Sequence, residues 1–122
     1  MEKMIMANVL VIDDSLLTRR KIKQYLTEAG HEILEAENGQ IALDVLEKEK
    51  DRIDCILTDL LMPVMNGFQF LENYKLEIPV VVLSSDIQNA SKEKVFRLGA
   101  KAMLNKPCKP EVLCSTIDRL VG

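Results

Sequence analysis

The chain has 122 residues, which is enough for one domain with a modest core and too few for a second catalytic domain. Its 16 Lys and Arg residues against 19 Asp and Glu residues argue against the basic patch of a nucleic-acid-binding protein. The longest uninterrupted apolar runs cover four residues, where a membrane-spanning helix needs roughly 20. Three cysteines without C-x-x-C spacing and an N-terminus unlike a signal peptide favour a reducing compartment. We therefore expect one soluble, cytoplasmic domain over residues 1–122, with its core at about residues 8–120.

Short aliphatic runs alternate with amphipathic patterns along the chain. The predicted strands lie at residues 9–12, 33–34, 55–58, 80–83 and 102–104. Most of them are nearly continuous aliphatic runs, which is typical of strands buried on both faces of a parallel sheet.

A predicted helix follows each strand, with apolar residues three and four positions apart. Gly30 and Gly99 stand where helix C-caps are expected, and Pro110 suits a first helical turn. The strict alternation predicts an α/β fold: a doubly wound, five-stranded parallel sheet, (βα)5, with right-handed crossovers. The helices present these apolar residues in chain order: Ile22, Tyr25, Leu26 and Ala29; Ile41, Ala42, Val45 and Leu46; Phe68, Leu71 and Tyr74; Val95 and Leu98; Leu113, Ile117 and Leu120.

Polar residues that could bind a ligand or take part in catalysis follow four of the strands. Ligands of open parallel sheets bind outside the carboxyl ends of the strands. If the strand order is 2-1-3-4-5, the first and third strands are neighbours, about 4.8 Å apart, and their terminal carboxylates converge. The residues at these four ends are Asp13 and Asp14, Asp59, Ser84 and Ser85, and Asn105 and Lys106.

Carboxylates brought so close need a positive partner, because a pair 4 Å apart repels by about 4 kcal/mol at an effective dielectric constant of about 20. Mg²⁺ fits an all-oxygen site of this kind, with Asp13, Asp14 and Asp59 as candidate ligands. Lys106 adds a fixed positive charge, and Ser84 adds a hydroxyl donor. An aspartate in this setting is equipped to attack a phosphoryl group. Since His31 is the single histidine, the phosphoryl group must come from another molecule.

Each of these residues also has an ordinary structural interpretation. Asp13 and Asp14 alone could cap a helix, and Asp59 alone could begin a turn. Lys106 alone is typical of a solvated surface, and Ser84 alone of a strand end. The combination of these residues at one edge of the sheet favours a phosphoryl-accepting site over these separate structural roles. Outside this set, we expect His31 to be exposed, Cys55 and Cys114 to lie in the core, and Cys108 to serve packing.

The sequence resembles the receiver domain of two-component response regulators, most closely the single-domain, chemotaxis-type members with a flavodoxin-like fold. The resemblance runs from about Asn8 to Leu120 and combines several motifs in order. They are VIDDS at residues 11–15, AENG at 36–39, TDLLMP at 58–63, NG at 66–67, PVVVLSSD at 79–86, GA at 99–100 and KP at 106–107.

The resemblance implies that Asp59 is the phosphoacceptor. It also implies that Asp14, Asp59 and the backbone carbonyl of Leu61 bind Mg²⁺ (or Mn²⁺), while Asp13 acts mainly through a metal-bound water. Lys106 would pair with Asp59 at rest and with the phosphoryl group afterwards, and the Lys106–Pro107 bond would be cis. The Ser84 hydroxyl would move toward the phosphoryl group.

Two positions depart from the usual pattern of the family. Met103 replaces an aromatic residue in the fifth strand, which affects how phosphorylation is reported to the surface. Cys108 replaces a common Phe, which lightens the packing under the last loop. Leu61 and Asp86, two residues beyond Asp59 and Ser84, are expected to tune self-dephosphorylation.

We therefore expect a phospho-accepting receiver that is not an enzyme beyond its own phosphorylation and dephosphorylation. Its partners would be a sensor histidine kinase or phosphotransfer protein and a downstream protein, which binds the face of the fourth helix, fifth strand and fifth helix. It would be a monomer or a phosphorylation-linked dimer and would bind neither nucleic acid nor membranes. The alternatives are a phosphate sink, a constitutive binding module, and a Mg²⁺-dependent phosphohydrolase. Leu61 counts against the hydrolase, because that chemistry needs a second carboxylate two residues after the nucleophile.

Overall fold

The protein folds as a five-stranded parallel sheet in the order β2-β1-β3-β4-β5, which confirms the predicted strand order. The structure is a computed structural model and describes residues 6–85 and 89–122. No helix within these ranges is long and apolar enough to cross a bilayer. In chain order the elements are β1 (Asn8–Ile12), α1 (Leu16–Glu28), β2 (Glu32–Ala36), α2 (Gly39–Glu49), the 3-10 turn η1 (Lys50–Arg52), β3 (Cys55–Thr58), α3 (Gly67–Asn73), β4 (Val80–Ser84), α4 (Asn89–Arg97), β5 (Ala102–Asn105) and α5 (Pro110–Val121).

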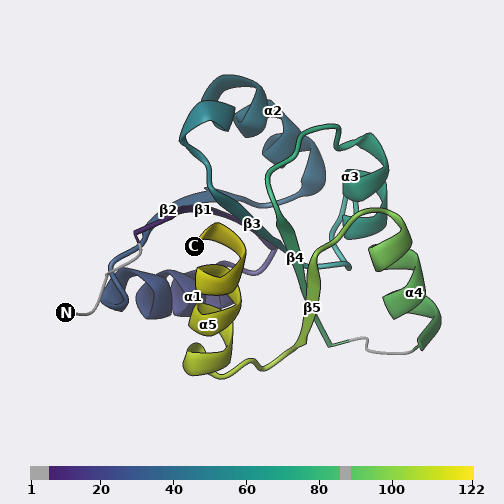
Figure 1. The fold of residues 1–122 in the computed structure, drawn as a ribbon. Coiled ribbons are helices and arrows are strands. Elements are labelled where there is room, and N and C mark those ends of the chain that lie inside the picture. Colours follow the sequence, from purple (N-terminus) through teal and green to yellow (C-terminus); the bar gives the residue numbers. More distant parts are fainter. Residues whose placement is uncertain (1–5, 86–88) are drawn as a thin grey trace.

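The helices cover both faces of the sheet, with α1 and α5 on one face and α2, α3 and α4 on the other (Figure 1). Successive residues of a strand point to opposite faces, so both faces need apolar side chains. In β1, Val9 and Val11 pack with Ile22 of α1 and Ile117 of α5. The intervening Leu10 and Ile12 pack in the cluster under α2, α3 and α4. This two-sided burial explains why the strands are continuous aliphatic runs.

Side chains outside the candidate site cap three of the helices. Ser15, Asn38 and Asn66 each accept a hydrogen bond from the backbone N–H three residues later. Such a cap satisfies one of the free N–H groups in the first helical turn. The interpretation of Asp13 and Asp14 as helix caps is therefore wrong, because Ser15 caps α1 and the two aspartates precede it at the edge of the sheet.

The third helix buries Leu71 as predicted, and its fully buried aromatic residue is Phe70, while the predicted Phe68 and Tyr74 pack partly buried against the core. Phe70 is fully buried, whereas Phe68 is only partly buried and has the Lys94 ammonium 4.5 Å from its ring centroid. Phe70 also stacks on Tyr74, with the ring centroids 5.5 Å apart. The helix has only seven residues and packs between α2 and α4, so its buried face is wider than a simple amphipathic stripe.

His31 is buried, so the expectation that it is exposed was wrong. Gly30, at a φ of 93°, turns the chain back from α1 toward β2. The His31 Nδ1 atom then accepts a hydrogen bond from the backbone N–H of Ala7 at 3.0 Å. Its Nε2 atom lies 3.8 Å from the Asp118 carboxylate of α5. The imidazole thus ties the start of β1 to the helix layer beneath it.

Replacing His31 by Leu should lower the free energy of unfolding by about 1–3 kcal/mol, because the buried Ala7 N–H would lose its acceptor. Urea unfolding of both proteins measures the change. His31→Asn, whose side-chain oxygen can accept a hydrogen bond, serves as a control and should lose less stability. Equal stability of His31→Leu and the wild type would contradict this role of the imidazole.

Candidate functional site

The register of the central strands brings Asp13 and Asp59 to the same edge of the sheet. Ile12 of β1 pairs with Thr58 of β3, and each strand ends at that residue. The Asp59 N–H continues the ladder by donating to the Ile12 carbonyl at 3.0 Å. One carboxylate oxygen from each of Asp13, Asp14 and Asp59 lies within 4.8 Å of the others. The convergence predicted from the strand order is therefore present.

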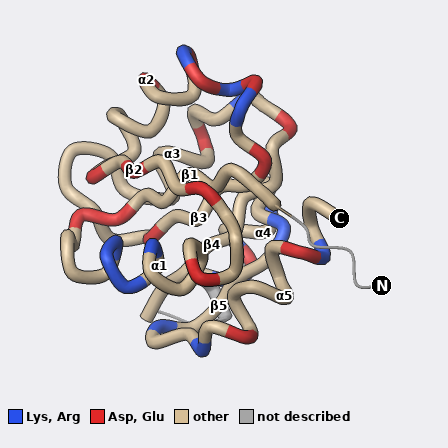
Figure 2. Tube along the Cα trace, turned by 90° about the vertical axis from the view of Figure 1, so that its left-hand side faces the viewer, with Lys and Arg blue, Asp and Glu red and all other residues tan. Residues whose placement is uncertain are grey.

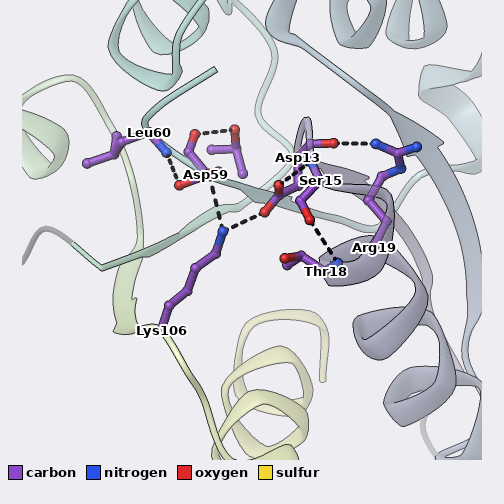
Figure 3. Close-up of polar contacts among 8 residues, drawn as sticks. Asp13, Ser15, Thr18, Arg19, Asp59, Leu60 and Lys106 are labelled. Atoms are coloured by element: carbon purple, nitrogen blue, oxygen red, sulfur yellow. Dashed lines mark hydrogen bonds and ion pairs between the residues drawn. The ribbon is translucent and has the colours of Figure 1, made fainter. Parts of the chain in front are cut away.

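The Lys106 ammonium lies between two of these carboxylates (Figure 3). Its Nζ atom is 2.6 Å from Asp13 Oδ2 and 3.2 Å from Asp59 Oδ2. The pair with Asp59 was expected, whereas the shorter contact with Asp13 was not. The Lys106 N–H donates to the Ser84 carbonyl at 3.0 Å. The Lys106–Pro107 bond is cis, as the resemblance implied.

Backbone groups hold the second oxygen of each paired carboxylate. Asp13 Oδ1 accepts the Ser15 N–H at 2.9 Å, and Asp59 Oδ1 accepts the Leu60 N–H at 2.7 Å. Asp13 and Asp59 are thus fixed from two sides and largely buried, with side-chain exposures of 3% and 12%. Asp14, by contrast, is exposed.

Burial and like charge oppose the ionised form of Asp59. Burial raises the pKa of the Asp59 carboxyl, the Lys106 ammonium lowers it, and the Asp13 carboxylate raises it, with a net upward shift. For Lys106, burial works against the charged form, but the contacts with Asp13 and Asp59 outweigh it and raise the pKa of the ammonium. Lys106 therefore stays charged at neutral pH.

The donor set fits a hard divalent cation. Three carboxylates against one ammonium leave the cluster with excess negative charge, and all the available ligand atoms are oxygens. Oxygen ligands of this kind suit Mg²⁺ and Mn²⁺ rather than softer metals. Asp13, Asp14 and Asp59 are the residues that could hold such an ion.

The remaining predicted residues lie around this cluster. Ser84 is buried at the end of β4, in register with Asn105 of β5. Leu61 follows Asp59 by two positions and exposes its side chain, so a role of its carbonyl stays a prediction. Asp86 lies outside the described residues, and its predicted role in self-dephosphorylation is untested.

Gly67 belongs to the NG motif at residues 66–67, and its role in supporting the site was not predicted. Its N–H donates to the Leu60 carbonyl at 2.8 Å. A Cβ atom at this position would lie 2.4 Å from the Asp59 carbonyl oxygen and 2.8 Å from Leu60 Cα. Only glycine lets the start of α3 approach the backbone of the acceptor so closely. The Asn66-Gly67 pair before the third helical pattern was the available sequence signal.

Gly67→Ala should cost about 1–3 kcal/mol of stability and weaken divalent-cation binding, because the backbone of Asp59 must move away from the new Cβ. Urea unfolding and Mn²⁺ titration measure the two effects. Gly99→Ala is the matched control, since Gly99 has a positive φ but open space around it. That variant should lose stability and keep its metal affinity. Equal metal affinities of the two variants would contradict a role for Gly67 at the site.

In EDTA at neutral pH, Asp59→Asn should be more stable than the wild type. Because the pKa of Asp59 is raised above 3.8 in the folded protein, stability falls as the pH rises through the folded pKa. Asparagine removes this cost, while Lys106 keeps its contact with Asp13. Urea unfolding measures the difference, with the exposed Asp51→Asn as the control. A less stable Asp59→Asn would mean that the pair with Lys106 outweighs burial and the repulsion from Asp13.

Comparison with known proteins agrees with this geometry. Residues 9–118 match the family described as the response regulator receiver domain. Protein PilH of Pseudomonas aeruginosa is 34% identical over 122 residues, which cover 96% of this chain and 99% of PilH. A chemotaxis protein CheY homolog of Campylobacter jejuni is 33% identical over 120 residues, which cover 93% of this chain and 92% of that protein.

A solved structure gives the same result in three dimensions. The chemotaxis protein CheY4 of Vibrio cholerae, crystallized at low pH, matches with a TM-score of 0.86 and 35% sequence identity. The match covers 95% of this chain and 99% of CheY4. The chain therefore belongs to the receiver domain family of two-component response regulators, and it is CheY-like.

Proposed function

We propose that this receiver takes a phosphoryl group from a histidine kinase or phosphotransfer protein onto Asp59 and thereby switches a protein-binding surface. The observation that carries the proposal is the Asp59 carboxylate, which lies beside Lys106 and within a cluster of three aspartates that fits a divalent cation. An isolated surface aspartate would have neither the fixed cation nor the neighbouring carboxylates.

In the proposed reaction an Asp59 oxygen attacks the phosphorus atom of a phosphohistidine. The new O–P bond forms as the P–N bond breaks, and the histidine nitrogen of the donor leaves with the electron pair and takes up a proton. Transfer of this kind depends mainly on positioning and on neutralising the phosphoryl oxygens. The Leu60 N–H, bonded to Asp59 Oδ1 at 2.7 Å, orients the carboxylate so that its other oxygen faces Lys106.

Asp14, Asp59 and the Leu61 carbonyl would hold Mg²⁺ or Mn²⁺, and Asp13 would act mainly through a metal-bound water. The bound ion would supply charge neutralisation at the phosphoryl oxygens. Lys106 gives up its contact with Asp59 and pairs with the phosphoryl group. The Ser84 hydroxyl donates to a phosphoryl oxygen. These contacts exist only in the phosphorylated state, so they shift the equilibrium between two conformations.

The output surface in this proposal is the face formed by α4, β5 and α5. It carries exposed apolar side chains, Phe96 and Val112. A depression of about 390 Å³ on this face is lined by residues that include Met103, Lys109 and Val112. Met103 packs partly against the core where receivers usually have an aromatic residue, so its response to Ser84 involves a smaller, more flexible side chain.

The test is intact-mass spectrometry after incubation with acetyl phosphate and Mg²⁺. The wild type should gain a single phosphoryl adduct that decays slowly, whereas Asp59→Asn and an EDTA-treated wild-type sample should gain none. Asp51→Asn, which changes an exposed aspartate away from the site, should gain the adduct like the wild type.

A folded protein that binds Mg²⁺ and gains no adduct would overturn the phospho-switch and favour a constitutive binding module. An adduct that leaves the α4–β5–α5 face unchanged in hydrogen exchange would favour a phosphate sink. Repeated turnover of small phosphate esters would instead indicate a phosphohydrolase.

A further inference from the structure

The Arg19 side chain of α1 links the acidic cluster to β2. Its Nη1 atom donates to the main-chain carbonyl of Asp13 (Figure 3). Its Nε atom donates to Glu35 Oε1 of β2 at 3.1 Å. The Arg19 side chain is only 13% exposed. It belongs to the longest basic run of the chain, Arg19-Arg20-Lys21, which lies on α1 (Figure 2). Arg20 and Lys21 are exposed, so Arg19 alone of the three is turned inward.

The carbonyl that Arg19 holds belongs to the peptide that joins Asp13 to Asp14. The orientation of this peptide plane determines where the Asp14 side chain begins. Asp13 has further restraints, because its N–H donates to the Ala36 carbonyl at 3.1 Å and its carboxylate is held by Ser15 and Lys106. Within residues 6–85 and 89–122, the Asp14 side chain makes no hydrogen bond or ion pair. The position of Asp14 therefore depends on its backbone.

Glu35 gives Arg19 a fixed orientation. The guanidinium is planar and presents neighbouring donors, so it bridges a carbonyl and a carboxylate at the same time. Glu35 also offsets the positive charge of Arg19, so the guanidinium does not act as an uncompensated cation near a metal site. The Lys23 ammonium lies 3.9 Å from the other Glu35 oxygen, and its side chain is 56% exposed. Its contribution to holding Glu35 in place is therefore small. A lysine at position 19 carries all its donors on one nitrogen atom, so it could not place donors at both the Nη1 and the Nε positions of Arg19.

We infer that Arg19, braced by Glu35, is a positioning residue that orients the Asp13–Asp14 peptide for divalent-cation binding. The inference rests on the proposed function, because it assumes that these aspartates bind the ion. Neighbouring groups that hold metal ligands in place commonly change metal affinity by 10- to 100-fold when they are mutated. Arg19 occupies such a place although it touches no carboxylate of the cluster.

The test compares Mn²⁺ affinities of the full chain by electron paramagnetic resonance of free Mn²⁺, at a temperature where urea curves show every variant folded. Arg19→Gln and Arg19→Lys should bind Mn²⁺ about tenfold more weakly than the wild type. Arg20→Gln removes the same charge from an exposed neighbour and should bind like the wild type. Glu35→Gln keeps an oxygen acceptor for Arg19 and should bind more tightly than Glu35→Ala.

A rate measurement separates positioning from general damage to the fold. If Arg19 acts through metal affinity, Arg19→Lys should react with acetyl phosphate at the wild-type rate once Mg²⁺ is saturating. A rate that stays low at saturating Mg²⁺ would overturn the inference, because it would place the defect outside metal binding.

The outcomes also separate this inference from the proposed function. If Arg19→Gln and Arg20→Gln bind Mn²⁺ equally while Asp14→Asn binds poorly, the positioning role fails and the metal site stands. If the wild type itself binds no Mn²⁺, both the metal site and the inference fail.

Discussion

The contact of the Lys106 ammonium with the Asp13 and Asp59 carboxylates is the interaction on which the site depends. The strand order makes β1 and β3 neighbours, and their register places two aspartates side by side at a partly buried edge. Without a cation, two carboxylates in this position repel each other and lose hydration. Lys106 supplies that cation from the far end of the chain, after β5. The fold thus brings together charges that the chain separates by 93 residues.

A second constraint is the close packing of backbone around the acceptor. The start of α3 lies against the Asp59–Leu60 backbone, where only Gly67 fits. In the same connection, Val64 adopts a φ of 68° with its side chain 80% exposed. A left-handed conformation costs an ordinary residue roughly 1–2 kcal/mol, and a β-branched one is especially rare there. The loop after Asp59 therefore departs from local preference, as loops at functional sites often do.

Much of the fold and the site could be predicted from the sequence. Continuous aliphatic strands alternating with amphipathic helices indicate a parallel α/β sheet, since both faces must be covered. Carboxyl ends of parallel strands share one edge, so Asp13, Asp14, Asp59 and Lys106 could be expected to meet. The predicted strand ends differ from the observed ones by a residue or two. Ser84, for example, is the last residue of β4 rather than the residue after it. In α3 the local pattern predicted Leu71 and missed Phe70, whose burial depends on the neighbouring helices α2 and α4.

The layered architecture and the identity of the converging groups can be predicted from the sequence alone, because periodicity and position relative to strand ends are local properties. Three features depend on the tertiary structure: the shorter contact of Lys106 with Asp13, the need for glycine at position 67, and the inward orientation of Arg19 within its basic run. These depend on distances of a few ångströms between separate segments. His31 shows the same limit: its neighbours Ala7 and Asp118 lie 24 and 87 residues away in the chain, and no local pattern marks such contacts.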